Sequence, residues 1–489
     1  MSDHLPILVF LVPFLAAICM PLVGLKDPGR CRPLALTALW AMFLLSAATL
    51  WRILSHGEIR YAFSGWTPPA GIEWVADEIA GIMVVVLSAL AFLSLLHTRH
   101  ETDAELGNRT VPYHAILLTL VSGLTGIVFA GDLFNIFVFL EIAALSGYAL
   151  VGVPGGRALV SAFRYLIMGA LGASFYLLGV SYFYVATGTL NMADLAQRVP
   201  DLLNSKAVIG GLSFMFIGLG IKMALMPLHG WLPDAYTEAR DSVSPLLAAL
   251  VTKIAALAWI RILYWVLAAG NGDRSLEIIG LLWVAGSLAA VAGSLLALTQ
   301  QDLKRRFAYG GLAHIGLVLV GVGQGNQTGL AGGLFYLIND AVMQCLLFIL
   351  AGAIARRYGA RTLEDLGRMR LPTPWIITGF VVVAISMIGL PPTGGFFGKW
   401  YIILSAIEKE NYVAVAAVLL TTLLTMAYFI QVLDRMLRDG ETGPRSPEVE
   451  TPLQLRLSAG VLSVAIVGLG LWSDRIVQVL LQATSRLGL

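Results

Sequence analysis

Seven ionisable side chains lie within stretches of sequence that are otherwise apolar enough to cross a membrane. They are Glu141, Lys222, His229, Lys253, His314, Asp340 and Lys399. Charged side chains at membrane depth are costly and commonly mark an ion or proton path. Burial shifts the pKa of such groups by up to about 3–5 units, and a nearby opposite charge reverses the shift. A buried acid and base that pair and separate can therefore load and release a proton.

Glu141 and Lys222 are the candidate acid–base pair. Glu141 lies near the middle of its apolar stretch, and Lys222 shortly precedes a proline-containing segment. Lys253 lies in the middle of another stretch, and Lys399 follows a second proline-containing segment. All four lie too deep for their charged ends to reach the membrane surface easily. Joined by the histidines and by water, they would conduct protons laterally.

These residues also have purely structural interpretations. A Glu–Lys pair can fix the register of two helices with little net stabilisation. His229 lies beside a helix breaker, where it can hydrogen-bond backbone carbonyls, and Asp340 can make a single structural hydrogen bond. Spacing identifies no carboxylate partner for Lys253 or Lys399. It places Arg261 near a helix end, where we expect an interfacial anchor.

The stretch YLINDAVMQCLLFIL, residues 336–350, places three polar side chains in one apolar helix: Asn339, Asp340 and Gln344. Asp340 and Gln344 are four residues apart and share one helix face. Asp340 can serve as a proton relay or as the counter-charge of a neighbouring lysine. Gln344 can orient water by donating and accepting hydrogen bonds, but it cannot hold a proton near neutral pH.

The chain that carries these residues has the composition of an all-α integral membrane protein. Of its 489 residues, 58% are hydrophobic and 13% are charged, whereas about a quarter are charged in soluble domains. Apolar runs of about 20 residues suit bilayer-spanning helices, and we expect fourteen. They lie at roughly 6–25, 33–54, 78–97, 111–130, 133–153, 162–187, 206–228, 243–268, 275–298, 307–323, 329–355, 375–406, 412–433 and 455–473. Lysines and arginines concentrate in alternate loops, so the positive-inside rule places both termini outside the cytoplasm.

Composition also excludes several classes of function. A formal net charge of +2 gives no indication of a nucleic-acid partner. Cys19, Cys31 and Cys345 are scattered singly and form no metal, redox or disulfide motif. The glycine-rich segment 321–329 lacks the βαβ context of a nucleotide site. We therefore expect no cofactor and no metal. The first apolar run follows MSDHLP, which lacks the basic region of a cleaved signal peptide, so we expect an anchored first helix.

Two of the apolar runs are interrupted by helix breakers. Pro227 and Pro233 interrupt the seventh run, and Pro391 and Pro392 interrupt the twelfth. The sequence separation of Pro227 and Pro391 equals that of the starts of the fourth and ninth runs. Five helices per unit is an odd number, so the second unit should be inverted, as in many transporters. We predict three N-terminal spans in 1–110, inverted repeats in 111–268 (spans 4–8) and 275–434 (spans 9–13), and span 14 with a short tail in 452–489.

Several segments together resemble a known family. GDLFNIFVFLE, KMALMPLHGWLPDAYTEA, LVTKIA, QQDLKRRFAYGGLAHIG and LPPTGGFFGKW are similar to the antiporter-like subunits shared by Mrp cation/proton antiporters, respiratory complex I and membrane-bound hydrogenases. The resemblance runs from about 75 to 435. The first motif and the chain length look most like the D-type subunit of the Mrp-type Na⁺/H⁺ antiporters.

The resemblance implies roles for individual residues. Glu141 matches the family's fifth-helix glutamate, and Lys222 matches its seventh-helix lysine partner. Lys253 matches the eighth-helix lysine that links two half-channels, and Lys399 matches the terminal proton site of the twelfth helix. His314 lies where the family often has a polar residue or histidine.

The chain departs from the family around Asp340. Relatives tend to carry a histidine before the acid and a lysine after it, where this chain has Asn339 and Gln344. The acid is kept, but both neighbouring positions are neutral amides, so the central proton relay differs at this step.

From these features we expect a proton-translocating subunit of a multi-subunit Na⁺(K⁺)/H⁺ antiporter in a bacterial cytoplasmic membrane. Its partners would be other subunits of the complex, membrane lipid, protons and monovalent cations. It would be a transporter subunit and not an enzyme. One alternative is a proton-pumping subunit of a redox-driven complex, such as a complex I relative or hydrogenase. Another is an assembly subunit that has lost conduction, for which Gln344 is the motivating feature.

Overall fold

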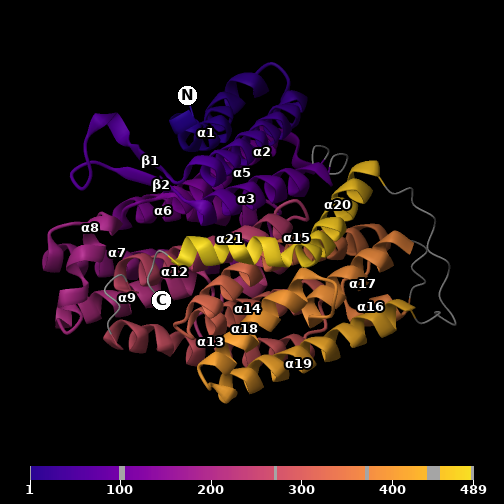
Figure 1. The fold of residues 1–489 in the computed structure, drawn as a ribbon. Coiled ribbons are helices and arrows are strands. Elements are labelled where there is room, and N and C mark those ends of the chain that lie inside the picture. Colours follow the sequence, from indigo (N-terminus) through magenta and orange to yellow (C-terminus); the bar gives the residue numbers. More distant parts are fainter. Residues whose placement is uncertain (1, 99–104, 269–272, 369–373, 438–451, 486–489) are drawn as a thin grey trace.

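The computed structural model describes residues 2–98, 105–268, 273–368, 374–437 and 452–485. Figure 1 shows a bundle of long helices with a small β-hairpin projecting at one end. Among the described residues, eleven helices are long and apolar enough to cross a membrane. The predicted all-α membrane fold is therefore confirmed.

The first half of the chain contains the following elements. They are α1 (Leu5–Gly24), α2 (Cys31–His56), β1 (Ile59–Ala62), β2 (Glu73–Ala76), α3 (Glu78–Leu96), α5 (Thr110–Phe129), α6 (Leu133–Gly152), α7 (Arg157–Thr187), α8 (Met192–Arg198), α9 (Lys206–Lys222), α10 (Leu232–Glu238), α11 (Ser244–Leu246) and α12 (Thr252–Arg261). Two π-helical segments, Leu247–Val251 and Ile262–Leu267, flank α12 and continue its helix. The antiparallel β1–β2 hairpin lies in a segment for which the sequence predicted no structure.

The regular elements of the second half are all helices among its described residues. Its elements are α13 (Asp273–Thr299), α14 (Leu303–Val322), α15 (Gln327–Tyr358), α16 (Leu363–Gly367), α17 (Pro374–Ile388), α18 (Gly394–Glu408), α19 (Tyr412–Leu437), α20 (Leu453–Leu471) and α21 (Ser473–Ser485). Helix α21 replaces part of the expected short tail. Its Val477 and Leu480 are buried, whereas its Gln478 is exposed, which is the pattern of a helix lying on a surface.

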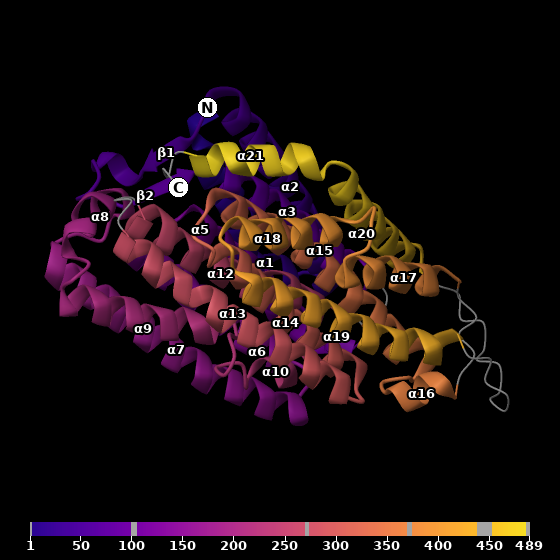
Figure 2. The same cartoon turned by 60° about the horizontal axis from the view of Figure 1, so that its bottom comes forward.

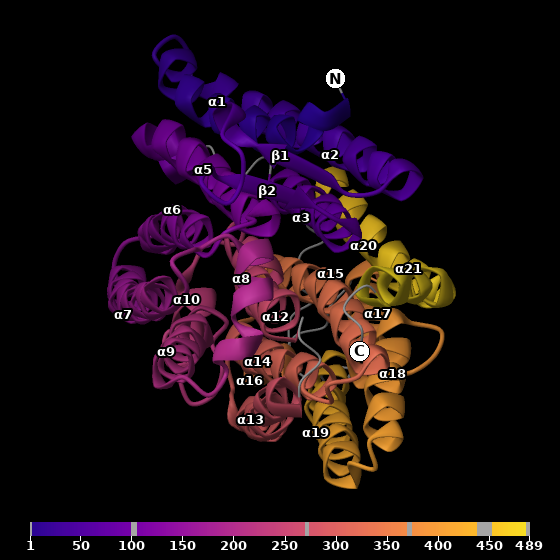
Figure 3. The same cartoon turned by 60° about the vertical axis from the view of Figure 1, so that its left-hand side comes forward.

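One helix forms the centre of the bundle. Figure 3, which looks more nearly along the helices, shows α15 in the middle with α12 and α14 beside it. The N-terminal α1, α2, α3 and α5 form a layer on one side, and α6, α7 and α9 form a flank. Helix α15 is buried along most of its length, so its polar residues face protein and not lipid.

Both predicted helix breaks are present. The first lies between the end of α9 at Lys222 and the start of α10 at Leu232, and the second between α17 and α18. Backbone groups freed at such breaks must be satisfied by protein or water. In the first break the Trp231 indole N–H donates to the carbonyl of Ile221 over 2.8 Å. In the second, the Lys399 ammonium donates to the carbonyls of Met387 and Ile388.

The two halves share a second feature that the sequence did not reveal. Asp132 caps the N-terminus of α6 and forms an isolated bridge with Asn191, which caps α8. Asp302 caps α14 and forms the corresponding bridge with Thr362, which caps α16. Helices α8 and α16 lie at opposite ends of the bundle (Figures 1 and 2). This inverted correspondence supports our proposal that 111–268 and 275–434 are inverted repeats.

Glycines allow α13 and α14 to approach closely. A Cβ atom at Gly286 would lie 2.6 Å from the carbonyl oxygen of Gly316, and one at Gly316 would lie 2.5 Å from the backbone nitrogen of Ala290. Small residues at such crossings are the usual means of packing membrane helices. Gly280, on the same α13, has open space at its Cβ position.

We expect Gly316→Leu to separate α13 from α14 and to destabilise the fold by about 1–3 kcal/mol or more, the usual cost of overpacking. Thermal unfolding of the detergent-solubilised protein measures the effect. Gly280→Leu is the matched control and should leave the melting temperature unchanged. Equal melting temperatures for the two variants would contradict the packing described.

Candidate functional site

The first cluster of buried ionisable groups joins α6 to α9. The Lys222 ammonium lies 3.3 Å from Oε1 of Glu141 and donates to the Tyr148 hydroxyl, also over 3.3 Å. Lys222 is the last residue of α9, directly before the helix break. Its side chain is buried, whereas that of Glu141 is 30% exposed. The predicted Glu–Lys pair is thus formed, with its acid near the surface of the bundle.

The second cluster lies at the centre of the bundle. Nζ of Lys253 lies 2.8 Å from Oδ2 of Asp340, and Nδ1 of His314 lies 2.8 Å from Oδ1 of the same carboxylate. The three residues come from α12, α15 and α14, and all are fully buried. Lys253 also donates to the carbonyl of Ala248 in the π-helical segment over 2.7 Å. Spacing alone identified no carboxylate for Lys253, and the structure supplies Asp340.

Lys399 forms the third group and has no carboxylate within ion-pairing distance among the described residues. Besides the two carbonyls of the break, its ammonium donates to the Thr422 hydroxyl over 3.2 Å. Those carbonyls are at the C-terminus of α17, where the helix dipole is negative. The half-helix therefore serves as the counter-charge of Lys399, an arrangement typical of discontinuous membrane helices.

The remaining predicted residues are placed differently. His314 belongs to the second cluster through its contact with Asp340. His229 is only partly buried, within the first break, with its ring 5.9 Å from that of Tyr309. The structure thus brings His314 into the series of buried groups and leaves His229 beside it.

The geometry of these groups suits transfer of protons between acids and bases. Asp340 contacts a lysine and a histidine at once, so a proton added to the cluster can be shared among three groups. Lys222 ends the helix before the first break, and Lys399 donates to two carbonyls of the second break. Glu141 and Lys222 can exchange their mutual contact for contacts with water or with Tyr148.

Sequence reasoning missed several polar residues. Tyr148 lies seven residues after Glu141, a spacing that places both on one helix face and could have identified it. Arg261 is not an interfacial anchor: it is buried, pairs with Asp77 and donates to the carbonyl of Val128. Arg306 is 1% exposed and donates to carbonyls at the C-terminal end of α13, which compensate its charge.

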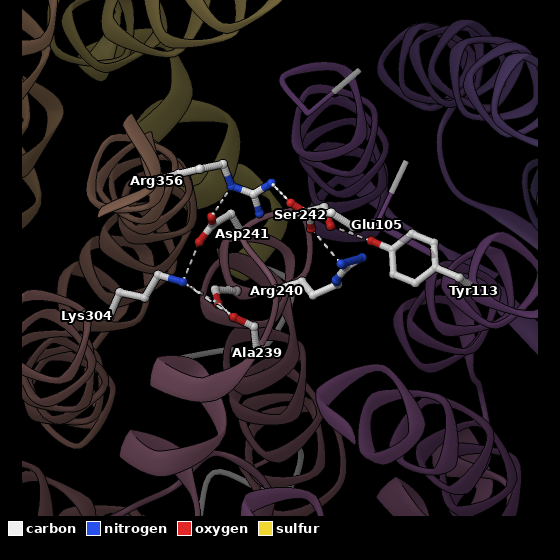
Figure 4. Close-up of polar contacts among 9 residues, drawn as sticks. Glu105, Tyr113, Ala239, Arg240, Asp241, Ser242, Lys304 and Arg356 are labelled. Carbon is white, nitrogen blue, oxygen red and sulfur yellow. Dashed lines mark hydrogen bonds and ion pairs between the residues drawn. The ribbon is translucent and has the colours of Figure 1, made fainter. Parts of the chain in front are cut away.

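A cluster of charges at one end of the helices was also missed. Asp241, in the loop between α10 and α11, lies 2.6 Å from the Lys304 ammonium and 2.9 Å from Nε of Arg356. Glu105 then bridges Arg356 and Arg240, at 3.0 and 2.6 Å. Figure 4 shows these side chains converging from α14, α15, the loop between α10 and α11 and the segment before α5. The cluster ties the loop of the first proposed repeat to α14 and α15 of the second.

The charged cluster borders a cavity of about 730 Å³, which also includes Glu238, Asp302 and Arg361 in its lining. Along α15, Phe348 lies between Arg356 and Asp340, and its ring packs against Tyr236 with centroids 5.7 Å apart. At 1.5 Å per residue, Arg356 is about 24 Å from Asp340. Phe348 therefore lies along α15 between the charged cavity and the buried central cluster.

Comparison with known proteins gives consistent matches. A family model described as NADH:quinone oxidoreductase/Mrp antiporter, TM, matches residues 130–425. The chain is 40% identical to NADH-quinone oxidoreductase subunit N of Desulforudis audaxviator, over 99% of this chain and 98% of that protein. It is 30% identical to the Na⁺/H⁺ antiporter D-type subunit of Alkalihalophilus pseudofirmus, over 88% of this chain and 86% of that protein.

Two solved structures are similar over nearly the whole chain. A chain of the membrane-bound sulfane sulfur reductase, an archaeal respiratory membrane complex, superposes with a TM-score of 0.91 at 28% identity, covering 99% of this chain and 98% of that one. A chain of the Mrp complex from Dietzia sp. DQ12-45-1b superposes with a TM-score of 0.88 at 25% identity, covering 99% and 97%.

We expect Asp241→Asn to destabilise the fold by about 3–5 kcal/mol, because it leaves the Lys304 ammonium without its carboxylate and Arg356 with Glu105 alone. Burial raises the pKa of Asp241, but the charges of Lys304 and Arg356 outweigh burial and bring it below the ordinary value. The contribution of Asp241 to stability is therefore complete above about pH 4 and is lost only as the pH falls further. Thermal unfolding measured from pH 6 to pH 9 should show a constant difference between the variant and the native protein.

Glu364→Gln is the matched control for the charged cluster, since the pair of Glu364 with Arg368 is exposed at the surface. Exposed pairs contribute about 0–1 kcal/mol. A melting temperature of Asp241→Asn no lower than that of Glu364→Gln would show that the cluster does not hold the helices together.

Proposed function

The chain belongs to the NADH:quinone oxidoreductase/Mrp antiporter family of transmembrane subunits, and we propose that it is the proton-conducting subunit of a multi-subunit cation/proton antiporter. It is a multi-pass membrane protein, and its structural relatives are subunits of multi-subunit membrane complexes. The observation that carries the proposal is the series of buried ionisable groups, from the Glu141–Lys222 pair through the Lys253–Asp340–His314 cluster to Lys399.

In the proposed mechanism the Glu141–Lys222 pair controls proton uptake. While the pair is closed, the negative carboxylate favours the charged form of Lys222. When the pair opens, the buried ammonium loses its counter-charge and releases its proton toward the centre of the bundle. Tyr148 stabilises Lys222 in either state through its hydroxyl. Lys222 is the last residue before the helix break, so a small movement there can open its contact with Glu141 and cause proton release.

The central cluster receives the proton next. Lys253 and His314 flank the same carboxylate, so protonation of one changes the proton affinity of the other through Asp340. Lys399, whose counter-charge is a helix end and not an acid, is the final site. Its neighbours are carbonyls and a hydroxyl, which accept from the ammonium without competing for the proton.

The proposed complex exchanges monovalent cations such as Na⁺ or K⁺ for protons in a bacterial cytoplasmic membrane. The relative from Alkalihalophilus pseudofirmus, named as a Na⁺/H⁺ antiporter component, and the match to a Mrp complex support this form. Other subunits of the complex are the expected partners.

A second candidate function is proton pumping in a redox-driven complex. It is favoured by the 40% identity to a protein named NADH-quinone oxidoreductase subunit N and by the superposition on a respiratory reductase chain. The chain itself would do the same proton transfer, and the energy would come from partner subunits. Mass spectrometry of the subunits that co-purify with the tagged chain decides between the two. Iron–sulfur subunits favour the redox form, and their absence with Na⁺-dependent exchange favours the antiporter.

We expect Lys222→Ala and Lys399→Ala each to abolish coupled exchange, because each removes the base that holds the proton at its step. Proton flux into vesicles that contain the purified complex measures this. Lys409→Ala, at an exposed lysine beyond the end of α18, is the control and should keep full flux. If both buried variants retain full coupled exchange, the chain does not conduct protons, and a non-conducting assembly role remains.

A further inference from the structure

An apolar groove lies on the outer surface of the bundle, between α6 and α7. Figure 3 shows these two helices side by side on one flank. The groove has a volume of about 420 Å³, and its lining includes Leu145, Ala149, Leu159 and Phe163. Leu145, Leu159 and Phe163 are each more than half exposed, so the groove is open to the surroundings of the bundle.

The inner side of the groove is formed by Tyr148, which is buried. Its ring meets that of Tyr165 edge-on, with centroids 4.5 Å apart, and the Tyr165 ring stacks on that of Trp231 at 4.1 Å. The Tyr148 hydroxyl accepts a hydrogen bond from the Lys222 ammonium. One side chain therefore lines the groove and also contacts the first cluster.

Positive charge gathers at one end of the groove. Val153, which lines that end and directly follows α6, accepts a hydrogen bond at its carbonyl from the Arg109 guanidinium over 2.9 Å. Arg157, the first residue of α7, lies between Val153 and Leu159 in the chain and also lines the charged cavity. Both arginines are exposed, and neither forms an ion pair with another described residue. Two uncompensated cations thus lie where the groove ends.

This distribution of apolar surface and charge matches one kind of occupant. Along α6 the lining runs from Val153 back to Leu145, which is eight residues or about 12 Å along the helix axis. A phospholipid has the same polarity, since its acyl chains are apolar and its phosphate lies at the membrane surface. Basic groups beside membrane helices are a common means of binding anionic head groups. The charge at the end of the groove therefore favours a lipid with net negative charge.

We propose that the groove between α6 and α7 binds one anionic phospholipid, whose phosphate contacts Arg109 and Arg157 and whose acyl chain lies against Tyr148. The bound chain covers the outer side of the tyrosine that contacts Lys222, so the site adjoins the first cluster. The assignment does not depend on the proposed function, because lipid binding requires neither proton transfer nor a particular partner complex.

Photocrosslinking in vesicles tests the site. The purified complex is reconstituted in phosphatidylcholine vesicles that contain a small fraction of phosphatidylglycerol with a photoactivatable group in its acyl chain. A parallel sample contains phosphatidylcholine with the same group. Mass spectrometry of the digested chain locates the crosslinks. We expect residues 145–166 to be labelled about tenfold more by phosphatidylglycerol, a preference that two arginines at a membrane surface can supply.

Two sets of variants separate the acyl-chain site from the head-group site. Ala149→Phe fills the groove and should remove the labelling of 145–166 by both lipids. Ala170→Phe, at an exposed alanine of α7 outside the groove, is its matched control and should keep native labelling. Arg109→Gln combined with Arg157→Gln should remove the preference for phosphatidylglycerol and leave labelling by phosphatidylcholine unchanged. Arg456→Gln, at an exposed arginine of α20, should keep the preference.

Several results would overturn the lipid site. Equal labelling of 145–166 by the two lipids in the native complex shows that no anionic lipid is selected. Absence of labelling there shows that another subunit covers the groove. Equal labelling of Ala149→Phe and Ala170→Phe shows that the lipid lies outside the groove. Where Ala149→Phe does not assemble into the complex, the double arginine variant decides: a lost preference supports the site, and a retained preference overturns it.

Discussion

The contact of Lys253 with Asp340 is the interaction on which the centre of the molecule depends. Two opposite charges, each fully buried, lie 2.8 Å apart on helices from different halves of the chain. Such a pair gives little net stability compared with apolar residues, but removing one partner leaves an uncompensated buried charge. The pair therefore fixes the position of α12 against α15, and His314 completes the shell of the carboxylate from α14. The rest of the bundle is arranged around this contact.

The need to compensate buried polar groups also explains the contacts at the two helix breaks. A broken helix frees carbonyl and amide groups that lipid cannot satisfy, so the surrounding protein must supply partners. At the second break, Lys399 satisfies two carbonyls, and those carbonyls in turn stabilise its ammonium. The broken helix thus compensates the buried charge of Lys399, and Lys399 supplies hydrogen-bond donors to the carbonyls of the break. At the first break, a tryptophan takes the structural role at Ile221, which leaves Lys222 available to Glu141 and Tyr148.

Sequence patterns predicted the local features well. The apolar runs identified the membrane helices, and the proline pairs identified both breaks, since these depend on residues close together in the chain. The Glu141–Lys222 pair was predicted from its two buried charges and again from the resemblance. Contacts between distant helices were not predictable in the same way: nothing in the spacing of Lys253 and Asp340 says that α12 and α15 are neighbours. Asp241 was not singled out from the sequence for the same reason, because its partners lie on α14 and α15.

The neutral amide at Gln344 can be understood from the charges around it. Lys253 and His314 already flank Asp340, so an additional base one turn away on α15 would compete for the single carboxylate and repel the lysine. A neutral amide avoids that repulsion in a region where charges interact strongly. It also offers both a donor and an acceptor, which a lysine does not. Gln344 therefore adds no charge to the centre of the bundle, and the central carboxylate keeps its two partners.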